Sequence, residues 1–424
     1  MFIPRGRVPV YISVLVIAAS LWPTASAAAA AMPLTIVEAA NLALTDEPGR
    51  ASLQARAVAA RERAVAEGRL PDPTMRVGLA NFPVSSGGFS TEGMTQAQLG
   101  FRQAFPRARA AAAERFSAQA EAFGHDAEAR GNDVLTAVRK AWLAAHLAQR
   151  SLALVDESRA YFEDLATVTR SLYSVGRKTQ HDVLRAELEL SRLEDRRIDA
   201  ERMLSEARAA LSRWIGADAR RPVAMDLPDW HALPDRADLR AGLDRHPLLA
   251  AASATVDAND AAVRVAEQNK KPGWALDLGY GYRDGFLPDG QPRSDFVSLA
   301  VTVELPFLGR QRQDRKLAAA LGDRRSAVNS RAELETRLGS ELDAEFARWT
   351  DLTRRLALYE SRILEQAQAQ AEAALLAYQS DAGDFSDVMR ARVDELDVRL
   401  EHIRLQVARA RSYAVLANLG GLEP

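Results

Sequence analysis

The sequence predicts a mainly α-helical fold with a small β part. Residues 107–221 and 307–423 contain no proline and place apolar side chains every three or four positions, a helical pattern much longer than an ordinary globular helix. Each stretch follows two short segments in which apolar and small or polar residues alternate, as in a β-strand with one apolar face. We therefore expect two long helical hairpins, each preceded by a β-hairpin.

Each long helical stretch is interrupted once, at residues 173–179 and 378–384. Both breaks contain a glycine that can form a turn, and residue types that cap helices follow it. The glycines are Gly176 and Gly383, and the capping candidates are Thr179, Asp384 and Ser386. If continuous, the limb of residues 107–173 would span on the order of 100 Å.

Composition excludes several classes of protein. The 424 residues include 55 basic and 57 acidic side chains, so the chain lacks the basic excess of a nucleic-acid-binding protein. It contains no cysteine, which excludes disulfides, thiolate chemistry and a lipidated N-terminal cysteine.

Residues 1–31 resemble an export signal followed by a linker. Arg5 and Arg7 precede the apolar run 8–22, and Ala25-Ser26-Ala27 offers a cleavage site. A retained N-terminal anchor is the alternative. No later segment contains 18 consecutive apolar residues, so we expect an exported chain without a transmembrane helix.

The order of the predicted elements occurs twice, which indicates an internal repeat. The prolines that interrupt or end the predicted elements recur at nearly constant spacing: Pro48, Pro73 and Pro106 correspond to Pro247, Pro272 and Pro306. The predicted first repeat, 32–215, contains a β-hairpin at 75–105 and a helical hairpin at 107–215. A proline-rich linker at 216–237 follows. The predicted second repeat, 238–424, contains a β-hairpin at 274–305 and a helical hairpin at 307–420.

The four strands pose a packing problem. A barrel needs about eight strands, and an open sheet would expose two edges and an apolar face to water. The sequence thus indicates that several chains contribute strands to one barrel, unless the β-hairpins are soluble and pack on the helices. Aromatic residues near the strand ends suit a membrane-interface belt. They are Trp274, Tyr280, Tyr282, Phe105 and Phe307, with Phe82 and Phe296 near other ends.

The element order, together with Leu70-Pro71-Asp72-Pro73, Tyr173-Ser174-Val175-Gly176, Asp182-Val183-Leu184 and Asp387-Val388-Met389, resembles the TolC-like family of outer-membrane efflux proteins. The resemblance implies a homotrimer with a 12-stranded barrel in the outer membrane and a periplasmic helical barrel. It also implies a passive duct that works with a periplasmic adaptor and an inner-membrane pump of the RND type.

The run 70–83, with Gln103-Ala104-Phe105-Pro106, is similar to the heavy-metal branch of that family. Drug, solvent or protein export by the same kind of duct is the alternative for the cargo. A non-porous periplasmic helical scaffold is a further alternative for the function.

In the resembled family, acidic rings at the start of the inner helices close the periplasmic entrance. Asp387 matches the first acidic position, Asp182 is its counterpart in the first repeat, and Asp384 lies beside it. Arg390 stands at the second acidic position and departs from the pattern. A threefold ring of Asp387 would attract cations. Alternatively, both aspartates only stabilise the first turn of a helix through its dipole.

The hairpin tips are where the resembled family meets its adaptor. Val175, Gly176 and Arg177 form the first tip, and Asp381 stands in the second tip where the first has Gly176. The alternative is a solvated turn without a partner.

No pattern of residues indicates an enzyme, a cofactor or a metal site. The six histidines form no pair at helical spacing that would bind zinc, and phosphate-loop and nucleophile motifs are absent from the sequence. The carboxylates and the histidine of the linker have no spacing that specifies a mechanism.

Overall fold

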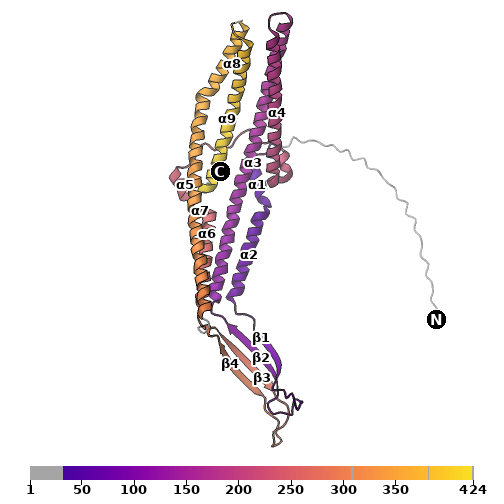
Figure 1. The fold of residues 1–424 in the computed structure, drawn as a ribbon, viewed down its shortest axis with the longest axis vertical. Helices are drawn as coiled ribbons and strands as arrows, with labels where there is room; N and C mark the ends of the chain where they lie inside the picture. Colours follow the sequence, from indigo (N-terminus) through magenta and orange to yellow (C-terminus); the bar gives the residue numbers. More distant parts are fainter. Residues whose placement is uncertain (1–31, 307–309, 381, 423–424) are drawn as a thin grey trace, which may run out of the picture.

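The computed structural model describes residues 32–306, 310–380 and 382–422. The molecule is long and narrow, with a β-sheet at one end and two helical hairpin tips at the other (Figure 1). The first hairpin consists of α3 (Arg109–Ser174) and α4 (Gln180–Ile215). The second consists of α7 (Arg310–Leu358), α8 (Leu364–Gln379) and α9 (Phe385–Gly420). These elements confirm the predicted mainly α-helical fold with a small β part.

The two long limbs differ in continuity. Helix α3 runs for 66 residues without a break. The corresponding limb of the second hairpin contains a π-helical turn, Tyr359–Ile363, between α7 and α8. The sequence analysis missed this turn because it contains neither proline nor glycine, the usual signals of a helix irregularity. The chain bends where α8 continues from α7 (Figure 1).

Shorter helices reinforce the half of the bundle nearest the sheet. They are α1 (Ile36–Thr45), α2 (Pro48–Gly68), α5 (Arg236–Leu243) and α6 (Pro247–Gln268). Helix α2 packs along α3, and α6 packs against both α3 and α7 (Figure 1). Pro48 and Pro247 each occupy the first turn of a helix, where the missing N–H would have no intrahelical partner. These prolines therefore begin helices as well as interrupting the helical pattern before them.

Apolar side chains form separate cores along the length of the molecule. A central core surrounds the fully buried Trp142 of α3, and a second core near the tips contains Phe162, Phe385 and Met389. The second core joins the two hairpins, because Phe162 belongs to α3 while Phe385 and Met389 belong to α9. None of the helices in the described part of the chain combines the length and hydropathy needed to cross a bilayer.

The sheet contains four antiparallel strands in the order β1 (Thr74–Ala80), β2 (Gln96–Phe105), β3 (Trp274–Tyr282) and β4 (Phe296–Val303). Pairing of β2 with β3 joins the two β-hairpins, with Gly100 opposite Gly279. Within this sheet, β1 and β4 each have a partner on one side only. The helices continue beyond the end of the sheet and leave its faces uncovered (Figure 1).

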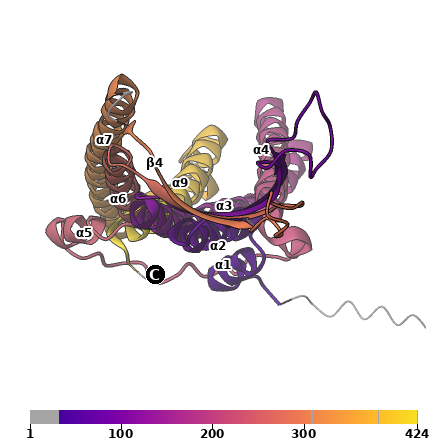
Figure 2. The ribbon, with the colours of Figure 1, turned by 90° about the horizontal axis from the view of Figure 1, so that it is seen from below.

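The predicted linker is bound tightly to the helices. After a 3-10 turn at Gly216–Arg220, the Leu34 N–H donates to the Pro222 carbonyl (2.8 Å) and the Ala224 N–H donates to the Leu34 carbonyl (3.0 Å). The indole N–H of Trp142 donates to the same Leu34 carbonyl (2.8 Å). Seen along the long axis, α1, α5 and this segment lie on one side of the long helices, and the opposite side is concave (Figure 2).

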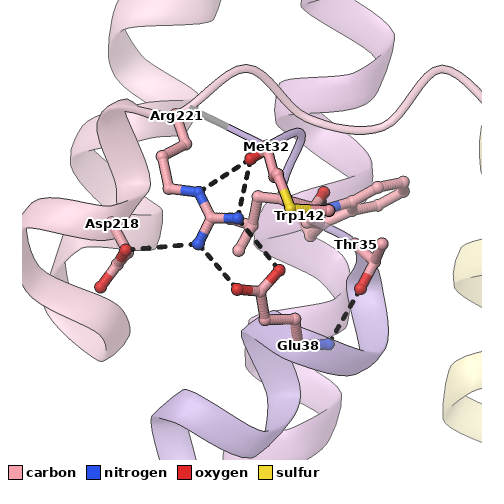
Figure 3. Close-up of polar contacts among 7 residues, drawn as sticks. Met32, Thr35, Glu38, Trp142, Asp218 and Arg221 are labelled. Atoms are coloured by element: carbon pink, nitrogen blue, oxygen red, sulfur yellow. Dashed lines mark hydrogen bonds and ion pairs between the residues drawn. The ribbon is translucent and has the colours of Figure 1, made fainter. Parts of the chain in front are cut away.

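Arg221 holds the start of the described chain in place (Figure 3). Its Nε and Nη2 donate to the Met32 carbonyl (3.0 and 2.7 Å), and its Nη1 binds Glu38 (2.7 Å) and Asp218 (3.4 Å). The hydrogen bond from Arg221 lowers the pKa of the Glu38 carboxyl. One guanidinium thus joins the chain before α1, α1 itself and the 3-10 turn after α4.

His146 gives the packing of the linker a predicted pH dependence. It is buried, stacks on Trp142 and donates from Nδ1 to the Ala224 carbonyl (3.0 Å). Burial lowers the pKa of His146 below 6.5, and the positive charge of Arg150 adds to the effect, while the hydrogen bond to Ala224 and the charge of Asp226 oppose it. The unfolded chain therefore binds the proton more tightly than the folded chain does, and stability should decline as the pH falls below about 6.5.

We expect the melting temperature of the purified protein to fall between pH 7.5 and pH 5.5, and His146→Gln to reduce this fall because glutamine cannot be protonated. His246 is also buried with a lowered pKa, so part of the dependence should remain. His181→Gln, at an exposed position, is the control and should leave the dependence unchanged. Equal pH dependence in wild type and His146→Gln would contradict the assignment.

Candidate functional site

The register of the sheet gathers its large apolar side chains on one face. Met75 lies opposite Phe101, Phe101 opposite Leu278, and Leu278 opposite Leu299, so one apolar row crosses all four strands. Val77 is 74% exposed, as is Val297 at the other edge. The exposed aliphatic and phenylalanine side chains of this face are Met75, Val77, Leu79, Leu99, Phe101, Leu276, Leu278, Val297, Leu299, Val301 and Val303.

A continuous apolar patch of this extent is uncommon on a water-exposed surface and indicates contact with lipid or protein. One polar residue, Gln103, lies on this face at the end nearest the helices. Its side-chain amide donates to the Pro71 carbonyl (2.9 Å). The soluble alternative, in which the β-hairpins pack on the chain's own helices, is wrong for this chain because the helices leave the sheet uncovered (Figure 1).

The opposite face of the sheet is small and polar. One row consists of Arg76, Gly100, Gly279 and Ser298. In the next row on this face, Arg102 Nε lies 3.8 Å from an Asp277 carboxylate oxygen, and Thr302 donates to the other oxygen (2.7 Å). Exposure along β3 alternates, with the residues of the polar face more covered than those of the apolar face.

Aromatic side chains mark both ends of the apolar face. Trp274 stacks on Phe105 at the end nearest the helices, with ring centres 4.1 Å apart. Tyr282 stacks on Phe89 at the loop end, and the Tyr280 hydroxyl donates to Asp295. Tyr282 is eight positions after Trp274, so the two groups lie about 26 Å apart along the strand and about 20 Å apart along the axis of a barrel whose strands tilt by about 40°. An apolar band of about 25 Å between aromatic girdles is typical of membrane β-barrels.

Two other aromatic predictions have different outcomes. Phe296 pairs with Gly281 and belongs to the small, polar face, where the Arg283 guanidinium lies 3.8 Å from its ring centre. Its inclusion among the belt residues is therefore wrong, because register assigns it to the other face. Phe307 lies outside the described residues.

The loops beyond the sheet are joined to each other. Arg293 Nη1 donates to the carbonyl oxygens of Ser90, Glu92 and Asp284 (3.1 to 3.2 Å), which belong to both loops. Arg283 adds a bond to the Gly93 carbonyl (3.2 Å). The sequence analysis missed both arginines because loop partners about 200 residues apart leave no local pattern.

The first hairpin tip is a closed turn. Gly176 adopts a left-handed φ of +73°, and the Arg177 N–H donates to the Leu172 carbonyl (2.9 Å) while the Gly176 N–H donates to the Tyr173 carbonyl (2.9 Å). This is a Schellman motif, which satisfies the last carbonyls of α3. Val175 is exposed beside it.

The second tip resembles the first only in part. The Ala382 N–H donates to the Ala377 carbonyl (2.9 Å), the same six-residue closure as in the first tip. Gly383 is not in the left-handed region, so the prediction that it supplies backbone freedom is wrong. A side chain at Gly383 would approach the Ala377 methyl group to 3.0 Å, which explains a small residue there. Asp381 lies outside the described residues.

The two tips lie at the same end of the molecule (Figure 1). The Lys178 ammonium lies 4.1 Å from the ring centre of Tyr378, a cation–π contact between the first tip and the second hairpin. The predicted entrance and tip residues that the structure describes are thus near this end of the bundle.

The candidate entrance aspartates have different local partners. Asp182 belongs to a capping box: its carboxylate accepts from the Thr179 N–H (3.0 Å), and Thr179 Oγ1 accepts from the Asp182 N–H (3.3 Å). Asp387 instead pairs with Arg390 one turn later (3.1 Å), and both side chains are more than half exposed. Asp182 therefore stabilises the first turn of α4 through hydrogen bonds, and its role at an entrance stays a prediction.

Asp384 occupies the N-cap of α9 but its side chain makes no capping hydrogen bond. Ser386 lies within the helix, so its prediction as a cap is wrong. Across residues 32–306, 310–380 and 382–422, no group of three or more histidine or acidic side chains is arranged to hold a metal ion.

Thr179 caps α4 with a side-chain hydrogen bond, whereas Asp384 makes no such bond at the start of α9, so substitutions at the two positions can be compared. Thr179→Ala should destabilise the start of α4 by about 1 kcal/mol and accelerate amide exchange in its first turn about fivefold. Asp384→Ala should change exchange at the start of α9 by less, because only the interaction with the helix dipole is lost. Hydrogen exchange of tip peptides measures both, and equal effects would contradict the assignment of the caps.

No model of a protein family matches the chain. Protein CyaE of Bordetella pertussis is 28% identical to it over 303 residues, which are 68% of this chain and 62% of that protein. The match thus spans less than two thirds of the length of this curated relative.

Solved structures resemble the chain over most of its length. CusC, described in connection with transmembrane channel formation, gives a TM-score of 0.78 at 15% identity and covers 95% of each chain. The outer membrane protein VceC of Vibrio cholerae gives 0.75 at 19% identity and covers 92% of this chain and 97% of its own. The MtrE outer membrane channel of Neisseria gonorrhoeae gives 0.73 at 17%, with 92% and 89% covered. The chain has the fold of these outer-membrane channel proteins.

Proposed function

We propose that this protein is an outer-membrane channel that serves as the passive exit duct of a tripartite efflux pump. The observation that carries the proposal is the exposed four-stranded sheet, apolar on one face and small or polar on the other, at the end of a long helical wall. Such a sheet fits a barrel wall with lipid outside and water inside.

The sheet can close only with strands from other copies of the chain. Strands β1 and β4 are antiparallel to each other, so the β4 edge of one copy can pair with the β1 edge of the next and give an all-antiparallel barrel. Three copies would supply the twelve strands that the resemblance to the TolC-like family implies. The concave side of the helical wall would continue the lumen (Figure 2).

The proposed location follows from the same geometry. The strands span the outer membrane between the aromatic groups around Trp274 and Tyr282, and the helices extend into the periplasm. We propose that a periplasmic adaptor binds the tips around Val175, Gly176, Arg177 and Asp381, and that an inner-membrane pump of the RND type drives transport. These tips lie farthest from the sheet, which supports their proximity to an adaptor (Figure 1).

For the cargo, heavy-metal cations are one candidate, supported by the run 70–83 and its similarity to the heavy-metal branch. Drug, solvent or protein cargo is the other candidate, supported by the equal likeness of the fold to several outer-membrane channels. The duct performs no chemical step in either case.

Adjacent residues of β4 test whether the sheet spans a membrane. Leu299→Lys places a charge on the apolar face and should cost about 2–4 kcal/mol of membrane stability, so little protein should reach the outer-membrane fraction as a trimer. Ala300→Lys, on the polar face, should insert and conduct in planar bilayers. If both variants instead behaved alike, as water-soluble proteins without conductance, a non-porous scaffold would replace the channel.

The pair of Asp387 and Arg390 tests the proposed entrance. If Asp387 faces the lumen, Arg390→Gln should strengthen block by divalent cations because it removes the charge 3.1 Å from the carboxylate. Asp387→Asn should weaken the block. Single-channel recordings with added divalent cations measure both, and opposite shifts are expected. Unchanged block in both variants would exclude these residues from the entrance.

A further inference from the structure

Three charged side chains lie on the polar face of the four strands: Arg76, Arg102 and Asp277. Arg102 and Asp277 are cross-strand neighbours with oppositely charged atoms 3.8 Å apart, and Asp277 also accepts the hydrogen bond from Thr302. These two residues therefore neutralise each other. Arg76 leaves each chain with one uncompensated positive charge on this face.

The Arg76 side chain makes no hydrogen bond or ion pair with any residue that the structure describes, and it is exposed on the edge strand β1. Its row across the sheet contains only Gly100, Gly279 and Ser298 besides itself. Because these neighbours are small, the guanidinium is the longest and the only charged group at its level of the sheet.

On strand β3, the glycines of the polar face lie close to polar side chains of the neighbouring strands. A side chain added at Gly279 would meet the Ser298 hydroxyl at 2.5 Å, and one added at Gly281 would collide with the Gln96 amide. The sheet and the helical wall curve in the same direction when seen along the long axis (Figure 2). This inference rests on the proposed function, in which the polar face lines the lumen of a trimer.

The size of such a barrel makes one arginine in each chain sufficient to influence the whole lumen. Twelve strands spaced about 4.8 Å apart and tilted by about 40° close at a diameter of roughly 25 Å. The Debye length is about 10 Å at 0.1 M salt and about 30 Å at 0.01 M, so the lumen axis lies within the field of the inward guanidinium groups.

We propose that Arg76 is a specificity-determining residue that makes the barrel part of the duct selective for anions. Three copies form one ring of positive charge, while the Arg102 and Asp277 pairs add none. Rings of arginine or lysine attract anions and repel cations in other pores. The cargo class favoured is anions, and the ring opposes the passage of free, hydrated metal cations.

The test is the reversal potential of purified trimers in planar bilayers under a tenfold KCl gradient at low salt. Wild type should reverse toward the chloride equilibrium potential, and Arg76→Gln should shift the reversal toward that of potassium. Arg76→Lys should retain the wild-type value because it retains the charge. The double variant Arg102→Gln with Asp277→Asn removes one charge of each sign and should also retain it. Raising the salt toward 1 M should reduce the difference between wild type and Arg76→Gln.

A second variant covers the case in which Arg76→Gln fails to insert. Ser298→Glu introduces a carboxylate into the row of Arg76 and should likewise abolish the preference for chloride. Trimers that conduct with the same reversal potential in wild type, Arg76→Gln and Ser298→Glu would overturn this inference and leave the proposed channel intact. Absence of conductance in wild-type protein would overturn both.

Discussion

The apolar face of the sheet is the constraint on which the rest of the structure depends. The strand register gathers the large apolar side chains on one side, and none of the elements that the structure describes covers them. Exposure of so large an apolar surface to water is unfavourable, because burial is worth roughly 25 cal/mol for each Å². In the proposed channel, lipid would cover this face and strands of further copies would pair with the two edges of the sheet.

The helical part extends far from the sheet as a thin wall, and packing between its helices keeps this wall in one shape. Helix α3 runs unbroken through most of this length, with α2 and α6 packed beside its sheet-proximal half. At mid-height Leu34 and Val223 form an isolated parallel bridge. Trp142 donates to the Leu34 carbonyl, and Arg221 donates to the Met32 carbonyl. These contacts fasten the beginning of the described chain to the junction between the repeats.

Charged residues of the same type differ in whether a neighbouring group offsets their charge. The Asp182 carboxylate caps the start of its own helix. The Asp387 carboxylate forms an ion pair with Arg390, and the Asp277 carboxylate forms one with Arg102. Arg76 has no such neighbour among the residues described, which is why its charge should act on passing solutes. In the proposed duct, the Asp387 and Arg390 pair adds no net charge to the entrance, whereas Arg76 adds a positive charge to the barrel.

The sequence by itself determined the features that depend on nearby residues: the long hairpins from helical periodicity, the strands from alternation, and the Gly176 turn from a residue that tolerates a left-handed backbone. Only the tertiary structure decided which side chains meet across long separations. Pairing of β2 with β3 brings Arg102 to Asp277, and packing against Ala377 sets the role of Gly383. The physical reason is that strand register, loop contacts and the linker bonds are set by residues far apart in the chain, which no local pattern encodes.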